Sequence, residues 1–307
     1  MTRRVVTNVA ASVRQRLLNI AKHSSRRFNE VMQHYAAERW LYRLSRSEYA
    51  GRFVLKGALM LRAWDIPVTR PTRDIDMLVR SANDLDAVRR MIMAICVTPV
   101  EDDGIVFDSE SVVTVGITED ADYEGIRATF SARLGTARVA MQIDMGFGDI
   151  VTPSPIKITY PTMLNMAAPT LRAYNRETAI AEKFEAMVKI GELNSRMKDF
   201  FDIWTLAKNC EFNGMAIANA FCRTFQRRGT TVNTAEPCFA KTYALSAAKA
   251  QQWKAFIKRA EIENAPSAFA DVWSFTMLFL RPVAIAIENN SPFNMHWPSG
   301  GPWQSVT

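Results

Sequence analysis

The stretch FVLKGALMLRAW, residues 53–64, decides the fold that this sequence predicts. Residues 53–55 have the composition of a buried strand, Lys56-Gly57 marks a turn, and residues 58–64 favour a helix. Such a turn presents free backbone N–H groups at the start of a helix, where they favour phosphate. Lys56 and Gly57 are therefore candidate nucleotide-binding residues, although a solvated helix start and a simple turn explain them equally well.

The rest of the chain extends this unit into an α/β fold. Strand-like alternation returns at residues 74–80, and a helical pattern follows at 82–96. Extended segments rich in β-branched residues then lie near 105–107, 111–117, 124–133 and 137–144. This succession predicts a mixed sheet with flanking helices, followed by a helical C-terminal domain. We expect four parts: basic N-terminal helices 1–50, an α/β domain 51–160, a helical domain 161–289 and an irregular tail 290–307.

Composition narrows the class of protein. With 307 residues, 48% of them apolar, the chain can bury a full core. Its four cysteines and three histidines are scattered, which argues against a disulfide framework and a zinc site. The N-terminus lacks a sustained apolar run, and no window reads as a membrane span, so we expect a cytoplasmic protein without a membrane partner. The formal charge of +7 favours a polyanion such as RNA, or an acidic partner.

Three carboxylates are candidate metal ligands. If residues 74–80 form a strand, Asp74 and Asp76 point the same way, and a divalent cation between them offsets their repulsion. Asp144 ends another alternating segment and supplies a third acidic side chain. Hard oxygen ligands suit Mg²⁺ or Mn²⁺, so the three predict a two-metal phosphoryl-transfer site. Taken alone, Asp74-Ile75-Asp76 is more typical of a turn or a solvated strand end than of a metal site.

Lys183 stands out in the helical part of the chain. At helical spacing, Ile180, Phe184 and Met187 form an apolar arc that also contains Lys183. An unpaired buried ammonium is costly, so this lysine either extends to solvent or points into a site.

The next predicted helix carries Asp199 and Asp202 on one face, three residues apart. Asp202 is a candidate site residue, or a partner for Lys198 in an ordinary surface pair.

Taken in order, these motifs resemble the AbiEii/AbiGii toxin family, including the MenT group, of type IV toxin–antitoxin systems. The resemblance covers about residues 50–210 and rests on five segments: 53–57 (FVLKG), 73–76 (RDID), 142–144 (QID), 181–184 (AEKF) and 194–202 (NSRMKDFFD). It implies a nucleotidyltransferase-like domain, NTP as substrate, Mg²⁺, and a cognate antitoxin encoded nearby.

The resemblance also implies roles for particular residues. Asp74 and Asp76 are similar to the family's metal ligands, Lys183 to its phosphate-holding lysine, and Asp199 to its last essential acid. Asp144 matches the place of a third carboxylate, and Arg73 is a further candidate for triphosphate contact.

The sequence departs from the family at residues 56–59, KGAL, where many members have Gly-Gly or Gly-Ser followed by a hydroxyl residue. This change removes a hydroxyl from the phosphate-binding turn.

The leading hypothesis is a metal-dependent nucleotidyltransferase toxin that transfers a nucleotide to the 3′ end of tRNA and releases pyrophosphate. A glycosyltransferase could use the same paired carboxylates to hold a metal-bound nucleotide sugar, but that leaves Lys183 unexplained. A non-catalytic module that binds RNA or protein through its basic surface is the third hypothesis.

Overall fold

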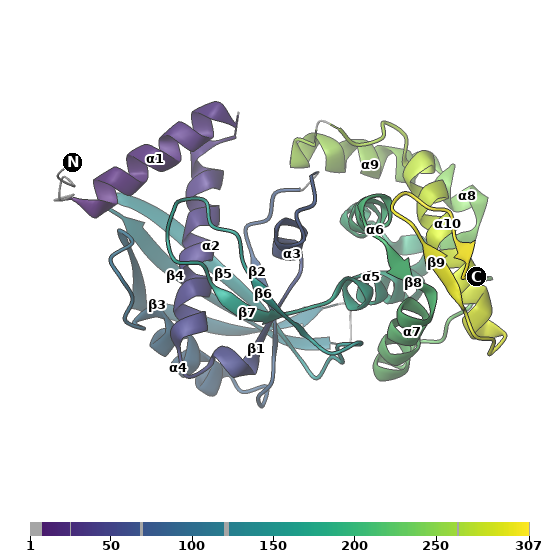
Figure 1. Ribbon diagram of the computed structural model, residues 1–307, viewed down its shortest axis with the longest axis horizontal. Helices are drawn as coiled ribbons and strands as arrows, with labels where there is room; N and C mark the ends of the chain where they lie inside the picture. The colour runs from purple at the N-terminus through teal and green to yellow at the C-terminus, as the bar shows by residue number, and fades with distance from the viewer. Residues whose placement is uncertain (1–7, 25, 68–69, 120–122, 263, 307) are drawn as a thin grey trace. The chain divides into compact units, whose positions relative to one another are not determined.

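The chain forms two compact units, seen in a computed structural model that describes residues 8–24, 26–67, 70–119, 123–262 and 264–306 (Figure 1). The first unit comprises the described residues within 1–63, 71–148 and 157–173, and the second those within 64–70, 149–156 and 174–307. The division of the sequence near residues 50, 160 and 289 stays a prediction.

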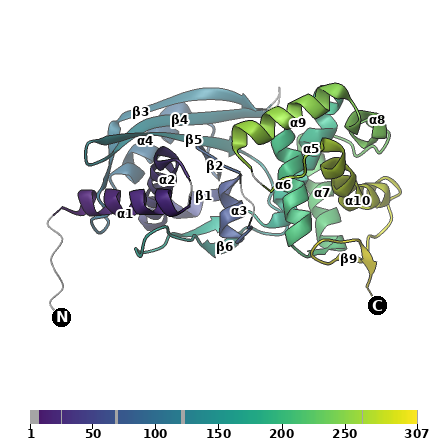
Figure 2. The ribbon, with the colours of Figure 1, turned by 90° about the horizontal axis from the view of Figure 1, so that it is seen from above.

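The sheet is mixed, as the sequence predicts, and seven strands form it. In spatial order they are β3 (Ile105–Glu119), β4 (Tyr123–Leu134), β5 (Ala137–Phe147), β2 (Ile75–Val79), β1 (Phe53–Lys56), β7 (Thr170–Ala173) and β6 (Ile156–Thr159). The β2–β5 and β1–β7 pairs are parallel, whereas β1–β2, β3–β4 and β4–β5 are antiparallel. The long strands β3, β4 and β5 run side by side (Figure 2). This arrangement confirms the predicted α/β fold.

The two extended segments expected near 105–107 and 111–117 are one strand, β3. The pairing of β3 with β4 shifts register between Asp108 and Val113. Such an irregularity interrupts the alternation of side chains, which is why the sequence reads as two strands.

Four helices belong to the first unit: α1 (Val9–His23), α2 (Phe28–Arg46), α3 (Leu59–Ala63) and α4 (Leu85–Cys96). The α4 helix begins where the Asp84 carboxylate accepts a hydrogen bond from the Ala87 N–H, at 2.7 Å.

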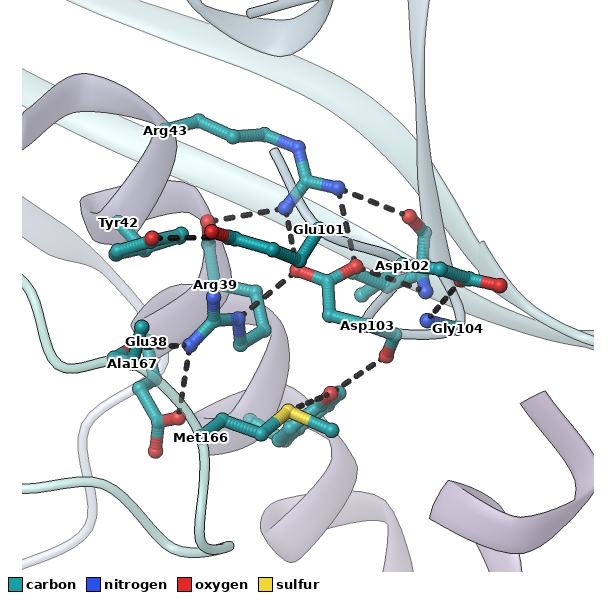
Figure 3. A network of polar contacts seen from close by, with 12 residues as sticks. Glu38, Arg39, Tyr42, Arg43, Glu101, Asp102, Asp103, Gly104, Met166 and Ala167 are labelled. Atoms are coloured by element: carbon teal, nitrogen blue, oxygen red, sulfur yellow. Dashed lines mark hydrogen bonds and ion pairs between the residues drawn. The ribbon is translucent and has the colours of Figure 1, made fainter. Parts of the chain in front are cut away.

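A buried carboxylate ties α2 to the loop before β3 (Figure 3). Asp103 accepts hydrogen bonds from Arg39 Nε at 2.9 Å and from Arg43 Nη1 at 2.7 Å. All three side chains are buried, and the two guanidinium groups share the one carboxylate.

The second unit is mainly helical. Its helices are α5 (Arg176–Ile190), α6 (Met197–Asn209), α7 (Gly214–Arg228), α8 (Lys241–Ala244), α9 (Ala247–Ala260) and α10 (Phe269–Glu288). The side chain of Asn175 caps α5 by accepting from the Thr178 N–H at 2.8 Å, and Gly191 ends that helix at a positive φ of 59°.

Glu185 on α5 is buried, although helical projection places it opposite the apolar arc. It pairs with Arg228 of α7 at 3.0 Å, and Asp149 and Glu182 lie against the same guanidinium at 3.2 and 3.4 Å. Burial opposes the charge of Arg228, but these carboxylates outweigh it and raise its pKa. This cluster explains why an acidic residue is accommodated in the packed face of α5.

The described residues 290–306 are more ordered than the irregular tail predicted for 290–307. They contribute β9 (Met295–Trp297) and β10 (Gln304–Ser305) to a small sheet with β8 (Phe212–Asn213). Trp297 is fully buried and its indole N–H donates to the Ala207 carbonyl at 2.7 Å. Trp303 donates to the Phe279 carbonyl at 2.8 Å. The two tryptophans therefore anchor a segment whose composition alone reads as loop.

Among the described helices, α10 has the length and apolar composition of a helix that could cross a membrane. The sequence analysis expected no such segment. Half of its most apolar window is buried inside the fold, and the core helix of a protein without membrane spans passes the same test.

Candidate active site

Four charged side chains occupy paired positions on four adjacent strands of the first unit. Lys56 of β1 is paired with Asp76 of β2, Asp76 with Asp144 of β5, and Asp144 with Arg127 of β4. Directly paired residues project from the same face of a sheet, and neighbouring strands lie about 4.8 Å apart. We call Lys56, Asp76, Asp144 and Arg127 the charged row; its two carboxylates are neighbours, with a cation on either side.

The glycine turn leaves room for one of these carboxylates. Gly57 has a φ of +73°, a conformation that favours glycine, and a Cβ added there would lie 1.9 Å from Asp76 Oδ2. Any side chain at this position would displace Asp76. The expected role of Gly57 in the turn thus extends to shaping the space around a candidate metal ligand.

Asp144 is held by a side chain that sequence reasoning missed. Arg127 donates from Nε to Asp144 Oδ1 at 2.7 Å and from Nη2 to Oδ2 at 2.8 Å, a bidentate pair. Gln142 also lies within 3.3 Å of both oxygens. Arg127 lies in the middle of β4, and no motif in the sequence singles it out. Its pairing with Asp144 was therefore not predictable from residue spacing.

Asp74 lies just before β2 and, like Asp76, is partly buried. The candidate triphosphate contact Arg73 is exposed, and its backbone carbonyl accepts from Gln33 Nε2 at 3.4 Å.

The donor chemistry of Asp74 and Asp76 fits a divalent cation, because both side chains are carboxylates and such cations prefer oxygen ligands. Within the residues that the structure describes, however, no three Asp, Glu, His or Cys side chains converge as a metal-binding group. Asp144 is adjacent in register, but Arg127 binds both of its oxygens. Asp74 and Asp76 remain candidate ligands, and Asp144 would have to exchange its arginine to become the third.

A second group of charges lies in the second unit, around α5 and α6. Lys183 Nζ lies 3.3 Å from Asp199 Oδ1 and 2.8 Å from Asp202 Oδ2. Arg196 Nε donates to Asp199 Oδ2 at 2.6 Å, and Arg70 binds both oxygens of Asp202 at 2.9 and 3.0 Å. We call these five residues the Lys183 cluster.

Burial and charge in the Lys183 cluster are unevenly distributed. The side chains of Asp199 and Asp202 are 0% and 1% exposed, whereas those of Lys183 and Arg196 retain 17% and 32%. Three cations surround two carboxylates within the cluster. The carboxylates are placed to hold the cations, and the cations keep access to an anion from solvent.

The pKa shifts follow from this arrangement. Burial opposes the charge of Lys183, but Asp202 and Asp199 outweigh it and raise the pKa of the amine. Burial alone would raise the pKa of Asp202, and Arg70 with Lys183 instead lowers it to about 2. The pKa of Asp199 is also lowered, against burial, mainly by Lys183 and Arg196. All three groups are therefore charged at neutral pH.

The predicted apolar arc is present, since Ile180, Phe184 and Met187 are fully buried. Lys183 lies among them and is paired, so it does not simply extend to solvent. The alternative in which Asp202 pairs with Lys198 at the surface is wrong, because Asp202 is buried against Arg70 and Lys183. Arg70 comes from a loop without periodicity, which gave the sequence reading no signal for it.

Comparison with known proteins gives one family and two structures. Residues 39–276 match a family model described as nucleotidyl transferase AbiEii toxin, type IV TA system. A candidate nucleotidyltransferase from H. pylori has a TM-score of 0.44 and 13% identity over 82% of this chain and 94% of its own. JHP933 from Helicobacter pylori has a TM-score of 0.44 and 15% identity over 82% and 90%. A search of curated proteins found no match.

Proposed function

Because the chain belongs to the AbiEii nucleotidyl transferase toxin family of type IV toxin–antitoxin systems, we propose that it transfers a nucleotide from an NTP to the 3′ end of an RNA, with tRNA as the first acceptor. The observation that carries this proposal is the charged row, in which the carboxylates of Asp76 and Asp144 are neighbours on one face of the sheet. Paired carboxylates of this kind suit metal-assisted phosphoryl transfer.

Asp74 and Asp76 would hold the divalent cation, with Asp144 as a third ligand once Arg127 is exchanged. Bound Mg²⁺ or Mn²⁺ supplies positive charge to the phosphates and favours ionisation of the acceptor hydroxyl. Gly57 leaves room for the Asp76 carboxylate, and Lys56 adds a cation one strand away. The acceptor 3′ oxygen forms a bond to the α-phosphorus, the bond from that phosphorus to the β-phosphate oxygen breaks, pyrophosphate leaves with the electron pair, and the hydroxyl proton passes to water.

The Lys183 cluster would bind the triphosphate. The partial exposure of the cations Lys183 and Arg196 suits an anion with several oxygens. Asp199 fixes both cations at 3.3 and 2.6 Å, which makes it a positioning residue for the phosphate contact. Arg73, exposed near Asp74, is a further phosphate contact in this proposal.

The test is incubation of the purified protein with each α-labelled NTP, Mg²⁺ or Mn²⁺, and total tRNA. We expect label on the RNA, lost in Asp76→Asn and in Lys183→Met, and retained in Lys241→Asn, a matched change at an exposed residue. A folded protein that labels no RNA with any nucleotide overturns the proposal. Transfer from nucleotide sugars would favour a glycosyltransferase instead.

Growth inhibition separates an enzyme from a binding module. In cells we expect Asp74→Asn and Asp76→Asn to abolish inhibition, whereas a non-catalytic module would keep it. The proposal also includes a cognate antitoxin and action in the cytoplasm. Co-expression of the neighbouring reading frame should restore growth, and failure to do so would remove the antitoxin from the proposal.

A further inference from the structure

The positive charge of the chain is concentrated at one end. Of its 38 Lys and Arg, seven lie in the first 29 residues, which contain no Asp or Glu, so the remaining 31 balance the 31 acidic residues. Five of the seven lie in the described part of the chain, on or just after α1: Arg14, Arg16, Lys22, Arg26 and Arg27. The whole formal excess of +7 therefore belongs to this segment. It also lies outside residues 39–276, the part that matches the family.

The α1 helix is fixed to the first unit by its apolar side. Val13, Leu17 and Ala21 recur every four residues and are buried, and the helix packs on α2 and β4. At its start the backbone approaches so closely that a Cβ on Gly104 would lie 2.9 Å from Ala10 Cα. The helix is thus packed against the first unit, next to α2 (Figure 1).

The other sides of α1 face solvent and carry the charge. Arg14, Arg16 and Lys22 are all exposed, and α1 has no acidic residue in its first turn. The Arg14 guanidinium lies 5.5 Å from the centre of the Phe28 ring, which orients it without neutralising it. A fixed helix with several uncompensated cations attracts a polyanion and releases that polyanion's counterions on binding.

We propose that α1 and the segment to Arg27 form an RNA-binding surface that holds the acceptor by its phosphate backbone. Four of the five described cations are arginines, whose planar fork matches phosphate. A membrane surface fits less well, because a helix that lies in a bilayer interface needs an exposed apolar side, and that side of α1 is buried. The choice of RNA over DNA rests on the proposed function.

The position of α1 implies a long acceptor. Its first turn lies near the turn that joins β4 to β5, since a Cβ added at Gly135 would lie 4.0 Å from Ala10 Cβ. Asp144 lies seven residues after Ala137, the first residue of β5, which at roughly 3.3 Å per residue is a distance of about 23 Å along the strand. A nucleic acid bound at α1 can reach the charged row only if it spans that distance, so the acceptor is a polymer and not a small molecule.

The experiment measures binding of fluorescein-labelled total tRNA by anisotropy over a range of salt concentrations. The variant is Arg14→Glu, Arg16→Glu, Lys22→Glu, and the matched control is Lys241→Glu, Lys254→Glu, Lys258→Glu, three exposed lysines of the second unit with the same change in charge. We expect the α1 variant to weaken binding about tenfold or more and to reduce the salt slope by about three, one per phosphate contact. The control should change affinity less than about threefold, since its lysines make no such contact.

Equal effects of the two variants would overturn the proposal, because they would show an effect of net charge alone. Unchanged tRNA binding in the α1 variant would also overturn it, as would tighter binding of duplex DNA than of tRNA. A third contrary outcome is sedimentation of the protein with phosphatidylserine vesicles together with no binding of tRNA. Thermal unfolding curves of both variants confirm that they fold, and the neutral Arg14→Gln, Arg16→Gln, Lys22→Gln variant should show a smaller loss of the same sign.

The binding result stands apart from the chemistry. If the wild type transfers label, the α1 variant should raise KM for tRNA and leave kcat unchanged. If no transfer is found, the anisotropy measurement still decides whether α1 binds RNA, and only the proposed reaction is lost.

Discussion

Replacing Asp202 by Asn should strongly destabilise the second unit. The carboxylate is 1% exposed and receives two hydrogen bonds from Arg70 and an ion pair from Lys183. Its pKa falls from 3.8 to about 2, and at 1.36 kcal/mol per unit this corresponds to about 2 kcal/mol of stability above pH 4. The amide also leaves the buried guanidinium without its anion, so we expect a total loss of about 3 kcal/mol.

The assay is urea unfolding followed by tryptophan fluorescence, at pH 7 and across pH 2–5. Because the folded pKa is depressed, the contribution of Asp202 is present above the unfolded value of 3.8 and is lost as pH falls through about 2. Wild type should lose this increment on acidification and Asp202→Asn should not. Glu211→Gln, an exposed change of the same charge in the same unit, should cost less than about 0.5 kcal/mol. An Asp202→Asn protein as stable as this control would refute the assignment.

Three further outcomes follow from the geometry. Gly57→Ala should lower the free energy of unfolding by about 1 kcal/mol or more, measured with urea. It should also weaken Mn²⁺ binding and nucleotide transfer, because the new Cβ displaces the Asp76 carboxylate. Unchanged Mn²⁺ titrations would contradict this. Burial raises the pKa of Glu38 to about 7, so its contribution is full below 4.5 and falls by about 3 kcal/mol as pH rises through 7. Glu38→Gln should flatten the pH dependence of unfolding between pH 5 and 8, and an unaltered profile would count against that role. Arg228→Met should lower stability by about 3 kcal/mol or more in the same urea assay, since it strands the buried carboxylate of Glu185 and its acidic neighbours; a neutral result would show that water reaches them.

The sequence predicts those parts of the fold whose cause is local. Local composition identified β1 and α3, alternation identified β2, and a helical pattern identified α4. The place of Lys183 on an apolar arc marked it as a candidate site residue. The pairing of Asp76 with Asp144 joins parallel strands far apart in the chain, which no local pattern encodes. Arg127 and Arg70 were missed for the same reason, because each is identified only by the carboxylate it meets.

The order of the two units along the chain sets a lower limit on the time needed to form the Lys183 cluster during synthesis. Residues 64–70 belong to the second unit, but Arg70 bonds to Asp202, 132 positions later. At about 5–20 residues per second of synthesis, Arg70 waits roughly 7 to 26 s for its partner. During that interval the growing chain already contains Asp74, Asp76 and Asp144 but has neither Lys183 nor Asp199. An incomplete product that ends between residues 144 and 183 therefore carries the candidate metal ligands without the proposed triphosphate contacts.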